Sequence, residues 1–238
     1  MAMAAAANLA MAESVIGPDD IPSIAIPKSE EGLQKARQAP AMELERIYIQ
    51  APHPTVHFFL QHPRIAFNIT RYILGKTGMR LEKEDEEDEM EKGQWLIRSQ
   101  GAKYRMIPLT AKSATGLAGF RFSIPVPILN NAWIGGHGLM KLDACPGEDA
   151  EETILSCSLY LAMSEESDGW NAAAKVYAQS QLRQEAMSMM ESFKYLCEEV
   201  AYDPESIAGD MESEEDLFTM DQIRQFKKQF LRAAAKKR

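Results

Sequence analysis

The chain has few cysteines, no excess of basic residues and no long apolar run. Its three cysteines, Cys145, Cys157 and Cys197, are widely spaced and odd in number, a pattern that indicates neither a disulfide framework nor a Cys-rich zinc site. The net charge of −9 argues against nucleic acid as a partner, because such binding depends on neutralising phosphates. No stretch approaches the roughly 18 apolar residues that a membrane-spanning helix requires.

Local signatures of common enzymes are also missing. The sequence contains neither a Gly-x-Ser-x-Gly nucleophile elbow nor a Gly-rich phosphate loop ending in Lys-Ser/Thr. His53 and His57 have the i, i+4 spacing that places two metal ligands on one helix face. Pro54 lies between them at a predicted helix start, however, so His53 is expected outside the helix. The motifs therefore predict no catalytic residue, no metal site and no cofactor.

The first 41 residues are expected to form an N-terminal extension. Residues 1–12 are almost all Ala, Met and Leu, and residues 10–12 have the small-x-small form of a secretory cleavage site, without a charged region before it. Two locations stay open: export or a periplasmic location if this stretch ends a signal peptide, and the cytoplasm otherwise. Residues 13–41 carry four prolines among scattered charges, which predicts an extended arm or linker.

Residues 42–203 are expected to form one α+β domain. A strand over residues 43–50 is followed by short helices at 55–61 and from Pro63 to Gly75. Alternating polar and apolar residues then predict antiparallel strands. The first begins at residues 79–83, and the others span residues 94–100, 103–109, 117–127, 133–143 and 153–163. The acidic run at 82–92 is expected to be the solvated end of a hairpin. Strands grouped between helices favour an antiparallel sheet over a parallel βαβ sheet.

The domain is organised around a long amphipathic helix predicted at residues 170–202. Its start carries turn residues and its end is set by Pro204. Apolar residues recur with 4-3-4-3-4 spacing, which keeps them on one stripe; they are Leu182, Ala186, Met189, Phe193, Leu196 and Val200. Charged residues, Glu185 among them, are expected on the remaining faces. Such a helix needs a broad apolar surface to lie on, and the predicted sheet supplies one.

Residues 204–238 are predicted to be an acidic linker followed by an amphipathic helix over about 214–235. The apolar stripe of this helix contains Leu217, Met220, Ile223, Phe226 and Phe230, and its end is basic. Such a helix can pack on the domain, or it can make peripheral contact with an anionic membrane. Both roles stay open.

The stretch from Glu45 to Ile65, ERIYIQAPHPTVHFFLQHPRI, resembles the opening of the START-like, or helix-grip, superfamily. In that superfamily a first strand runs into an Ala-Pro turn, a short V-x-x-F-L helix and a break of the kind formed here by His62-Pro63. The order of the later elements is also similar, so the resemblance covers about residues 42–202. It implies a curved antiparallel sheet with two short helices after the first strand, wrapped on the long C-terminal helix, with an apolar cavity between sheet and helix.

Members of this superfamily include lipid-transfer proteins, binders of hydrophobic ligands, and polyketide cyclases or aromatases. The resemblance therefore predicts a protein that binds or carries an apolar, lipid-like small molecule. Two alternatives stay open: a cyclase-like enzyme that uses a polar cavity group such as His137 or Tyr104, and an interaction module whose cavity is filled. From alternation and the helix stripe, the residues expected to bind the ligand are Phe120, Phe122, Trp133, His137, Leu159, Met189 and Phe193, with His137 as the polar contact.

Overall fold

A computed structural model describes residues 31–74, 95–99, 102–108, 116–126, 132–163, 172–214 and 217–234. The signal-like segment at 1–12, the strand expected at 79–83 and the acidic run at 82–92 lie outside these ranges.

The described strands form one antiparallel sheet with the path β1-β7-β6-β5-β4-β3, and β2 also pairs with β7. The strands are β1 (Ala41–Glu43), β2 (Ile47–Ile49), β3 (Trp95–Ser99), β4 (Ala102–Pro108), β5 (Gly116–Val126), β6 (Ala132–Pro146) and β7 (Thr153–Met163). The first predicted strand is divided into β1 and β2, which pair with different parts of β7. The long strands β5, β6 and β7 follow one another in sequence and pair as neighbours.

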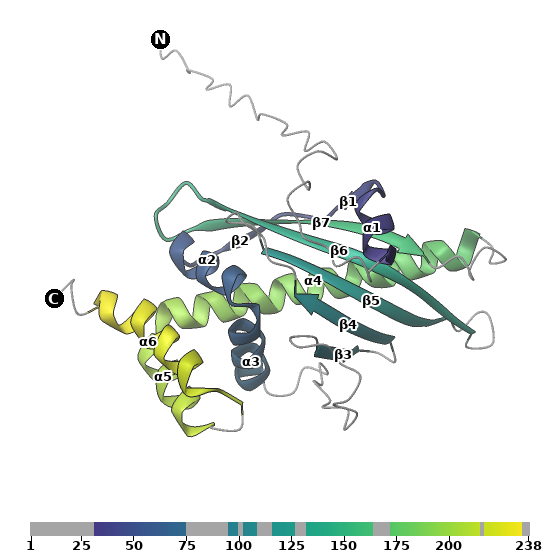
Figure 1. Cartoon of the computed structure of the whole chain (residues 1–238). Helices are drawn as coiled ribbons and strands as arrows, with labels where there is room; N and C mark the ends of the chain where they lie inside the picture. Colours follow the sequence, from purple (N-terminus) through teal and green to yellow (C-terminus); the bar gives the residue numbers. More distant parts are fainter. Residues whose placement is uncertain are drawn as a thin grey trace, which may run out of the picture.

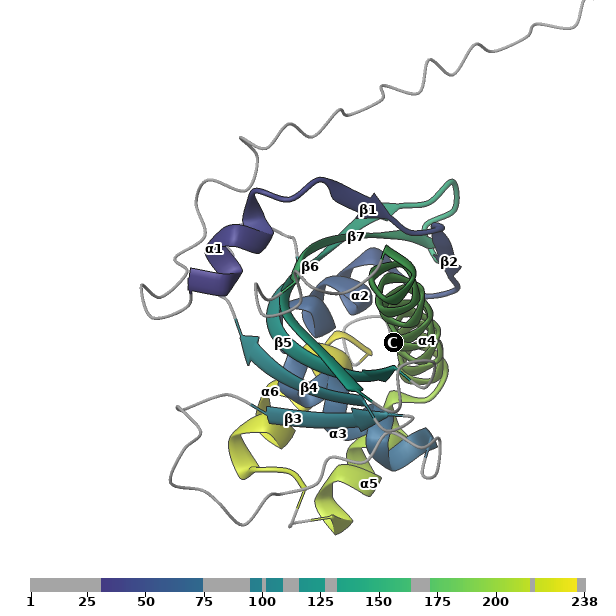
Figure 2. The ribbon, with the colours of Figure 1, turned by 90° about the vertical axis from the view of Figure 1, so that its right-hand side faces the viewer.

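The sheet curves around helix α4 (Ala172–Tyr202), which lies along its concave side (Figures 1 and 2). This confirms the predicted α+β helix-grip arrangement and places the long helix within two residues of its expected start. Alternation along the strands turns Phe120, Phe122 and Ile124 of β5 toward α4, with Leu155, Cys157 and Leu159 of β7. These side chains and those of α4 form the main apolar core.

The convex side of the sheet carries a second, smaller core. Helix α1 (Glu31–Arg37) packs there, with Leu33 and Ala36 buried against Leu139 and Tyr160. Residues 31–41 thus form a helix and a strand of the sheet, contrary to the predicted extended arm. The physical reason is that Leu33 and Ala36, spaced i, i+3, give even this short helix an apolar face.

Two helices follow β2 as expected, α2 (His53–Gln61) and α3 (Pro63–Leu74). The fully buried Phe59 and Ile69 anchor them at one end of the concave side, beyond which α4 ends. Pro54 stands in the first turn of α2, where a missing backbone N–H costs nothing. His53 lies inside the helix boundary, contrary to the prediction, and its Nε2 is 3.2 Å from the carbonyl oxygen of Ala144.

The segment after α4 folds back on α2 and α3 (Figure 1). The predicted acidic linker is a helix, α5 (Pro204–Ser213), and α6 (Met220–Ala234) follows it. Pro204 ends α4 but also occupies the first turn of α5, where proline is favoured. The Asp203 carboxylate caps this new helix by accepting a hydrogen bond from the Ser206 backbone N–H at 3.0 Å. The same two residues therefore end one helix and start the next.

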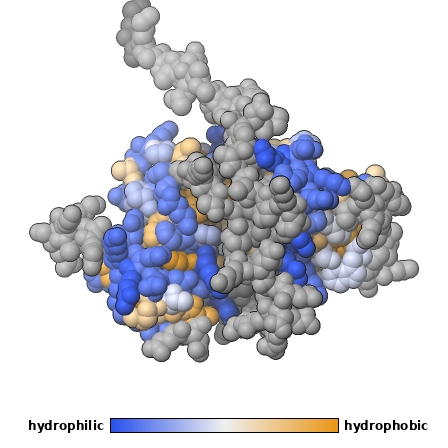
Figure 3. All heavy atoms as spheres, in the orientation of Figure 1, coloured by the Kyte–Doolittle hydropathy of each residue, from blue (hydrophilic) through white to orange (hydrophobic). Residues whose placement is uncertain are grey.

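The apolar side of α6 is occupied by the protein itself. Ile223 and Phe226 are buried, and the Phe230 ring lies 5.1 Å from the ring of Phe58 and 5.7 Å from that of Phe59. This packing places most of the predicted apolar stripe against the domain, and peripheral membrane contact by the helix stays a prediction. Among the described helices, none is both long and apolar enough to cross a membrane. On the face shown in Figure 3, apolar areas of the described residues are interspersed with hydrophilic ones.

Candidate functional site

A small pocket lies between α4 and the concave side of the sheet. Nine residues from five elements line it: Tyr104 and Met106 of β4, Phe120 of β5, Met140 of β6, Leu159 of β7, and Leu182, Glu185, Ala186 and Met189 of α4. The space between these side chains is about 20 Å³, which is room for about one water molecule. In this conformation the side chains fill most of the gap between helix and sheet.

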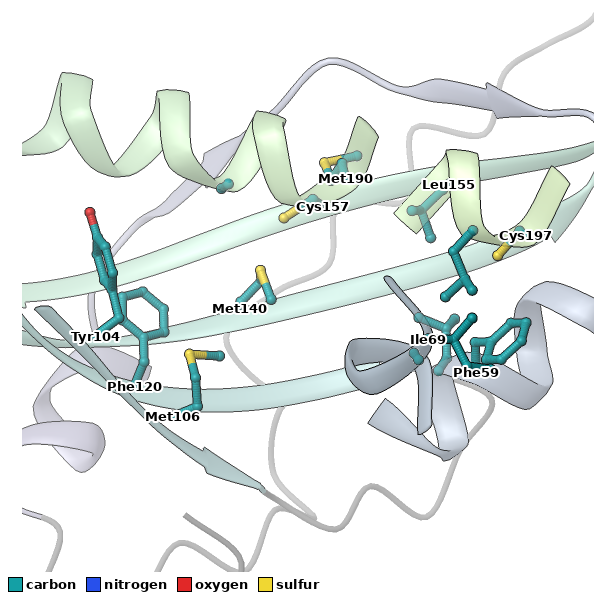
Figure 4. Close-up of a cluster of buried hydrophobic side chains, with 14 of the residues drawn as sticks. Phe59, Ile69, Tyr104, Met106, Phe120, Met140, Leu155, Cys157, Met190 and Cys197 are labelled. Atoms are coloured by element: carbon teal, nitrogen blue, oxygen red, sulfur yellow. The ribbon is translucent and has the colours of Figure 1, made fainter. Parts of the chain in front are cut away.

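Most of the lining is apolar and deformable. Three of the nine side chains are methionines, which are unbranched and adapt their shape easily. Figure 4 shows Met106 and Met140 beside Phe120 on the side of the sheet that faces α4. A methionine lining can open for a ligand with little loss of packing, whereas branched side chains are stiffer.

The pocket also has a polar end. Tyr104 and Glu185 are 6% and 7% exposed, and the Tyr104 hydroxyl points toward α4 in Figure 4. Burial, and then the nearby Glu185 carboxylate, raise the pKa of the Tyr104 hydroxyl well above its usual value. Tyr104 therefore keeps its proton at any physiological pH and remains able to donate a hydrogen bond.

Three of the predicted ligand residues are brought together at this pocket: Phe120, Leu159 and Met189. They come from two strands and from the helix, as the alternation and the helix stripe indicated. Ala186, on the same predicted stripe, lies beside them.

The other four predicted residues lie elsewhere. Phe122 and Phe193 belong to the core but do not line the pocket. Trp133 is 49% exposed. His137 occupies the convex side of the sheet, where its ring stands against Gly32 of α1, and this corrects the expectation that His137 supplies the pocket's polar contact. In β6 the odd-numbered positions 133 to 139 face away from α4, because its inward positions are Ile134, Gly136, Gly138 and Met140.

The space beside the glycines of β6 is filled by aromatic rings. Gly136 and Gly138 pair with Phe122 and Phe120 across the sheet. A Cβ on Gly138 would stand 2.3 Å from the Phe120 ring, and one on Gly136 would stand 2.4 Å from the Phe122 ring. The Gly-rich stretch therefore makes room for two cross-strand phenylalanines, a common arrangement in sheets, and not for a ligand.

Sequence reasoning missed Glu185 and Met140. Glu185 was expected on the polar side of α4, and this was wrong. Glu185 lies three residues after Leu182 and four before Met189, so the spacing places it on the apolar stripe. Its charge led to the prediction that it faces solvent. Met140 lies on the side of β6 that faces α4, together with Gly136 and Gly138. The sequence predicts this position for Met140 only when the register between β5 and β6 is known.

The histidines in α2 and directly after it have local partners. The His57 ring Nε2 is 3.4 Å from the Gln61 side-chain amide, and His62 Nδ1 is 2.8 Å from the Phe58 carbonyl oxygen. Within the described ranges, no three His, Cys, Asp or Glu side chains are grouped closely enough to hold a metal ion.

The three cysteines are free and differ in exposure. Cys145 is exposed, whereas Cys157 and Cys197 are buried. Burial raises the pKa of the Cys157 thiol to about 12, with smaller contributions from Glu43 and Asp143, and burial likewise raises the pKa of Cys197. The reactive species is the thiolate, so the two buried thiols are protected both sterically and by protonation.

We expect a maleimide at pH 8 to modify one cysteine of the folded protein and three after denaturation. At that pH a thiol of pKa about 12 is ionised in only about one molecule in ten thousand. Mass spectrometry of the labelled chain checks the count, and a Cys145→Ser variant is the control that should remain unlabelled while folded. Rapid labelling of Cys157 in the native protein would contradict the burial of β7 beneath α4.

No family model matches the chain, and no curated protein matches it. Similar solved structures include a START superfamily protein from Mycobacterium smegmatis, with 8% identity over 68% of this chain and 97% of that chain and a TM-score of 0.38. Another is Ara h 8.0201, with 10% identity, 66% and 97% coverage and a TM-score of 0.40. A third is truncated norcoclaurine synthase from Thalictrum flavum, with 10% identity, 66% and 92% coverage and a TM-score of 0.32. The chain has a helix-grip fold, as its element order and sheet path show.

Proposed function

We propose that the chain binds an apolar small molecule in the pocket between α4 and the concave side of the sheet. The observation that carries this proposal is the lining itself: seven of its nine residues are apolar, and they converge from four strands and one helix. Burying apolar ligand surface there contributes about 25 cal/mol for each Å² removed from water.

The size of the pocket bears on which ligands fit. A space of about 20 Å³ admits a larger molecule only if the side chains of Met106, Met140 and Met189 move aside. Methionine permits this because its three rotatable bonds give many shapes of similar energy. Such side-chain movements open space for a compact molecule more readily than for a long-chain lipid. We therefore propose a ligand of one or two rings in place of the lipid-like molecule expected from the sequence.

We expect the neutral two-ring fluorescent probe Prodan, 6-propionyl-2-(dimethylamino)naphthalene, to bind saturably with one site per chain. Replacement of Ala186 by Leu should weaken binding about tenfold or more, because the added carbons occupy the space that the probe needs. Fluorescence titration gives the affinity, and a thermal melt with and without probe should show stabilisation of the folded state by the bound molecule.

The matched control is Ser188→Leu, which adds a similar side chain at an exposed position of the same helix and should leave probe affinity unchanged. Both variants must melt cooperatively for the comparison to count. If the wild-type protein binds no probe, or if Ala186→Leu binds as well as wild type, this pocket is not the ligand site. The interaction-module alternative with a filled cavity would then take its place.

A further inference from the structure

The hydroxyl of Tyr104 is a buried polar group at the pocket. Among the described residues, its oxygen is the buried side-chain atom for which no hydrogen-bond partner is found. Burying such a group unpaired is destabilising, and buried hydroxyls in folded proteins almost always have a protein or water partner. Because Tyr104 lines the pocket, a molecule bound there can supply a hydrogen-bond partner.

Glu185 provides an acceptor at the same place. Its carboxylate lines the pocket from α4 and is close enough to Tyr104 to raise the pKa of the hydroxyl. Glu185 has a further interaction partner, but an ionised carboxylate has two oxygens with about four acceptor positions. It can therefore accept an additional hydrogen bond from a ligand.

Resting on the proposed function, we infer that Tyr104 and Glu185 select an apolar ligand that carries a hydroxyl group. The Tyr104 O–H donates to the ligand oxygen, and the ligand O–H donates to the Glu185 carboxylate. A ligand carbonyl can only accept and a ligand ammonium can only donate, whereas a hydroxyl does both. An anionic head group does not fit, because the described residues of the lining include no Lys, Arg or His and Glu185 would repel it.

The direct test compares 2-naphthol with naphthalene, which share the apolar body and differ by one hydroxyl. Isothermal titration calorimetry should show that the wild-type protein binds 2-naphthol about tenfold more tightly than naphthalene, the effect of one to two net hydrogen bonds. In Tyr104→Phe and in Glu185→Gln, the ratio of the two affinities should fall to about threefold or less.

Tyr160→Phe is the matched control. Tyr160 is also 6% exposed, but it lies on the convex side of the sheet against α1, so its loss should leave the tenfold preference unchanged. The ligand-free proteins give a second readout. Removal of the Tyr104 hydroxyl in Tyr104→Phe should raise the melting temperature by about 2–4 °C. Tyr160 has an interaction partner, so Tyr160→Phe should not raise the melting temperature.

The outcomes separate this inference from the proposed function. Equal affinity for the two compounds, with both blocked by Ala186→Leu, overturns the hydroxyl preference and leaves the pocket as an apolar ligand site. A preference that survives both Tyr104→Phe and Glu185→Gln also overturns it. Binding of neither compound overturns the inference and the proposed function together. A lower melting temperature for Tyr104→Phe would show that the hydroxyl is paired in the ligand-free protein and would likewise overturn the inference.

Discussion

A chain that ends at Asp203 is expected to lose cooperative folding, although it retains the whole sheet and all of α4. The reason is that α5 and α6 cover part of the main core. Their buried side chains belong to the same apolar cluster as those of α2, α3 and α4; they are Ile207, Ala208, Met211, Phe218, Ile223 and Phe226. Asn68 of α3 also donates a hydrogen bond to the Leu217 carbonyl oxygen at 2.7 Å.

The magnitude follows from the size of what is removed. Loss of a single fully buried phenylalanine side chain costs about 3–5 kcal/mol, and a typical domain is stable by only about 5–15 kcal/mol. The truncation removes Phe226, Phe218 and several aliphatic side chains together, and it exposes Phe58 and Phe59 to water. The expected result is an aggregating chain or one that unfolds without a sharp transition, as measured by circular dichroism and size-exclusion chromatography.

A point variant isolates the same effect without changing chain length. Phe226→Ala should lower the free energy of unfolding by about 3–5 kcal/mol, because Phe226 is fully buried and its ring centroid lies 4.7 Å from that of Phe230. The neighbouring Gln225→Ala, at an exposed position of the same helix, should be within about 0.5 kcal/mol of wild type. A truncated chain with an unchanged melting temperature would show that α5 and α6 are dispensable to the domain.

The second large effect is expected at Gly136. A Cβ there would stand 2.4 Å from the Phe122 ring and 2.6 Å from the backbone carbonyl oxygen of Ala162. The ring can rotate, but the carbonyl belongs to β7, and moving it disturbs the ladder between β6 and β7. We expect Gly136→Ala to lower the free energy of unfolding by about 3 kcal/mol, the upper end of the usual cost of overpacking a core.

Two other glycines make the comparison specific. The three atoms nearest to a Cβ on Gly138 all belong to the Phe120 ring, which can rotate. Gly138→Ala should therefore cost less, about 1 kcal/mol, and the displaced ring should reduce probe binding in the adjacent pocket. Gly209 of α5 has open space around it, so Gly209→Ala should stabilise the protein by about 0.5–1 kcal/mol through helix propensity. Urea unfolding gives all three values. Equal stability of Gly136→Ala and wild type would show that the β6–β7 register differs from the one described.

The expected location of the ligand site was partly right because it depended on local periodicity. Strand alternation assigned Phe120 and Leu159 to one face of their strands, and helix spacing assigned Met189 and Ala186 to one stripe. Such patterns describe a side chain's direction relative to its own element. They do not show which side of a strand faces α4. His137 and Trp133 were therefore predicted on the concave side of the sheet, and this was wrong.

The sequence by itself determined which segments become the long helix and the central strands, because their apolar residues recur with the period of each element. It also determined the order of elements, and with it the α+β class. Only the tertiary structure decided that phenylalanine rings fill the space beside Gly136 and Gly138. It also decided that Glu185 is buried in the pocket and that α5 and α6 cover one end of the core. Each of these depends on contacts between residues far apart in the chain. Their energies enter only when strand register and helix packing bring those residues together.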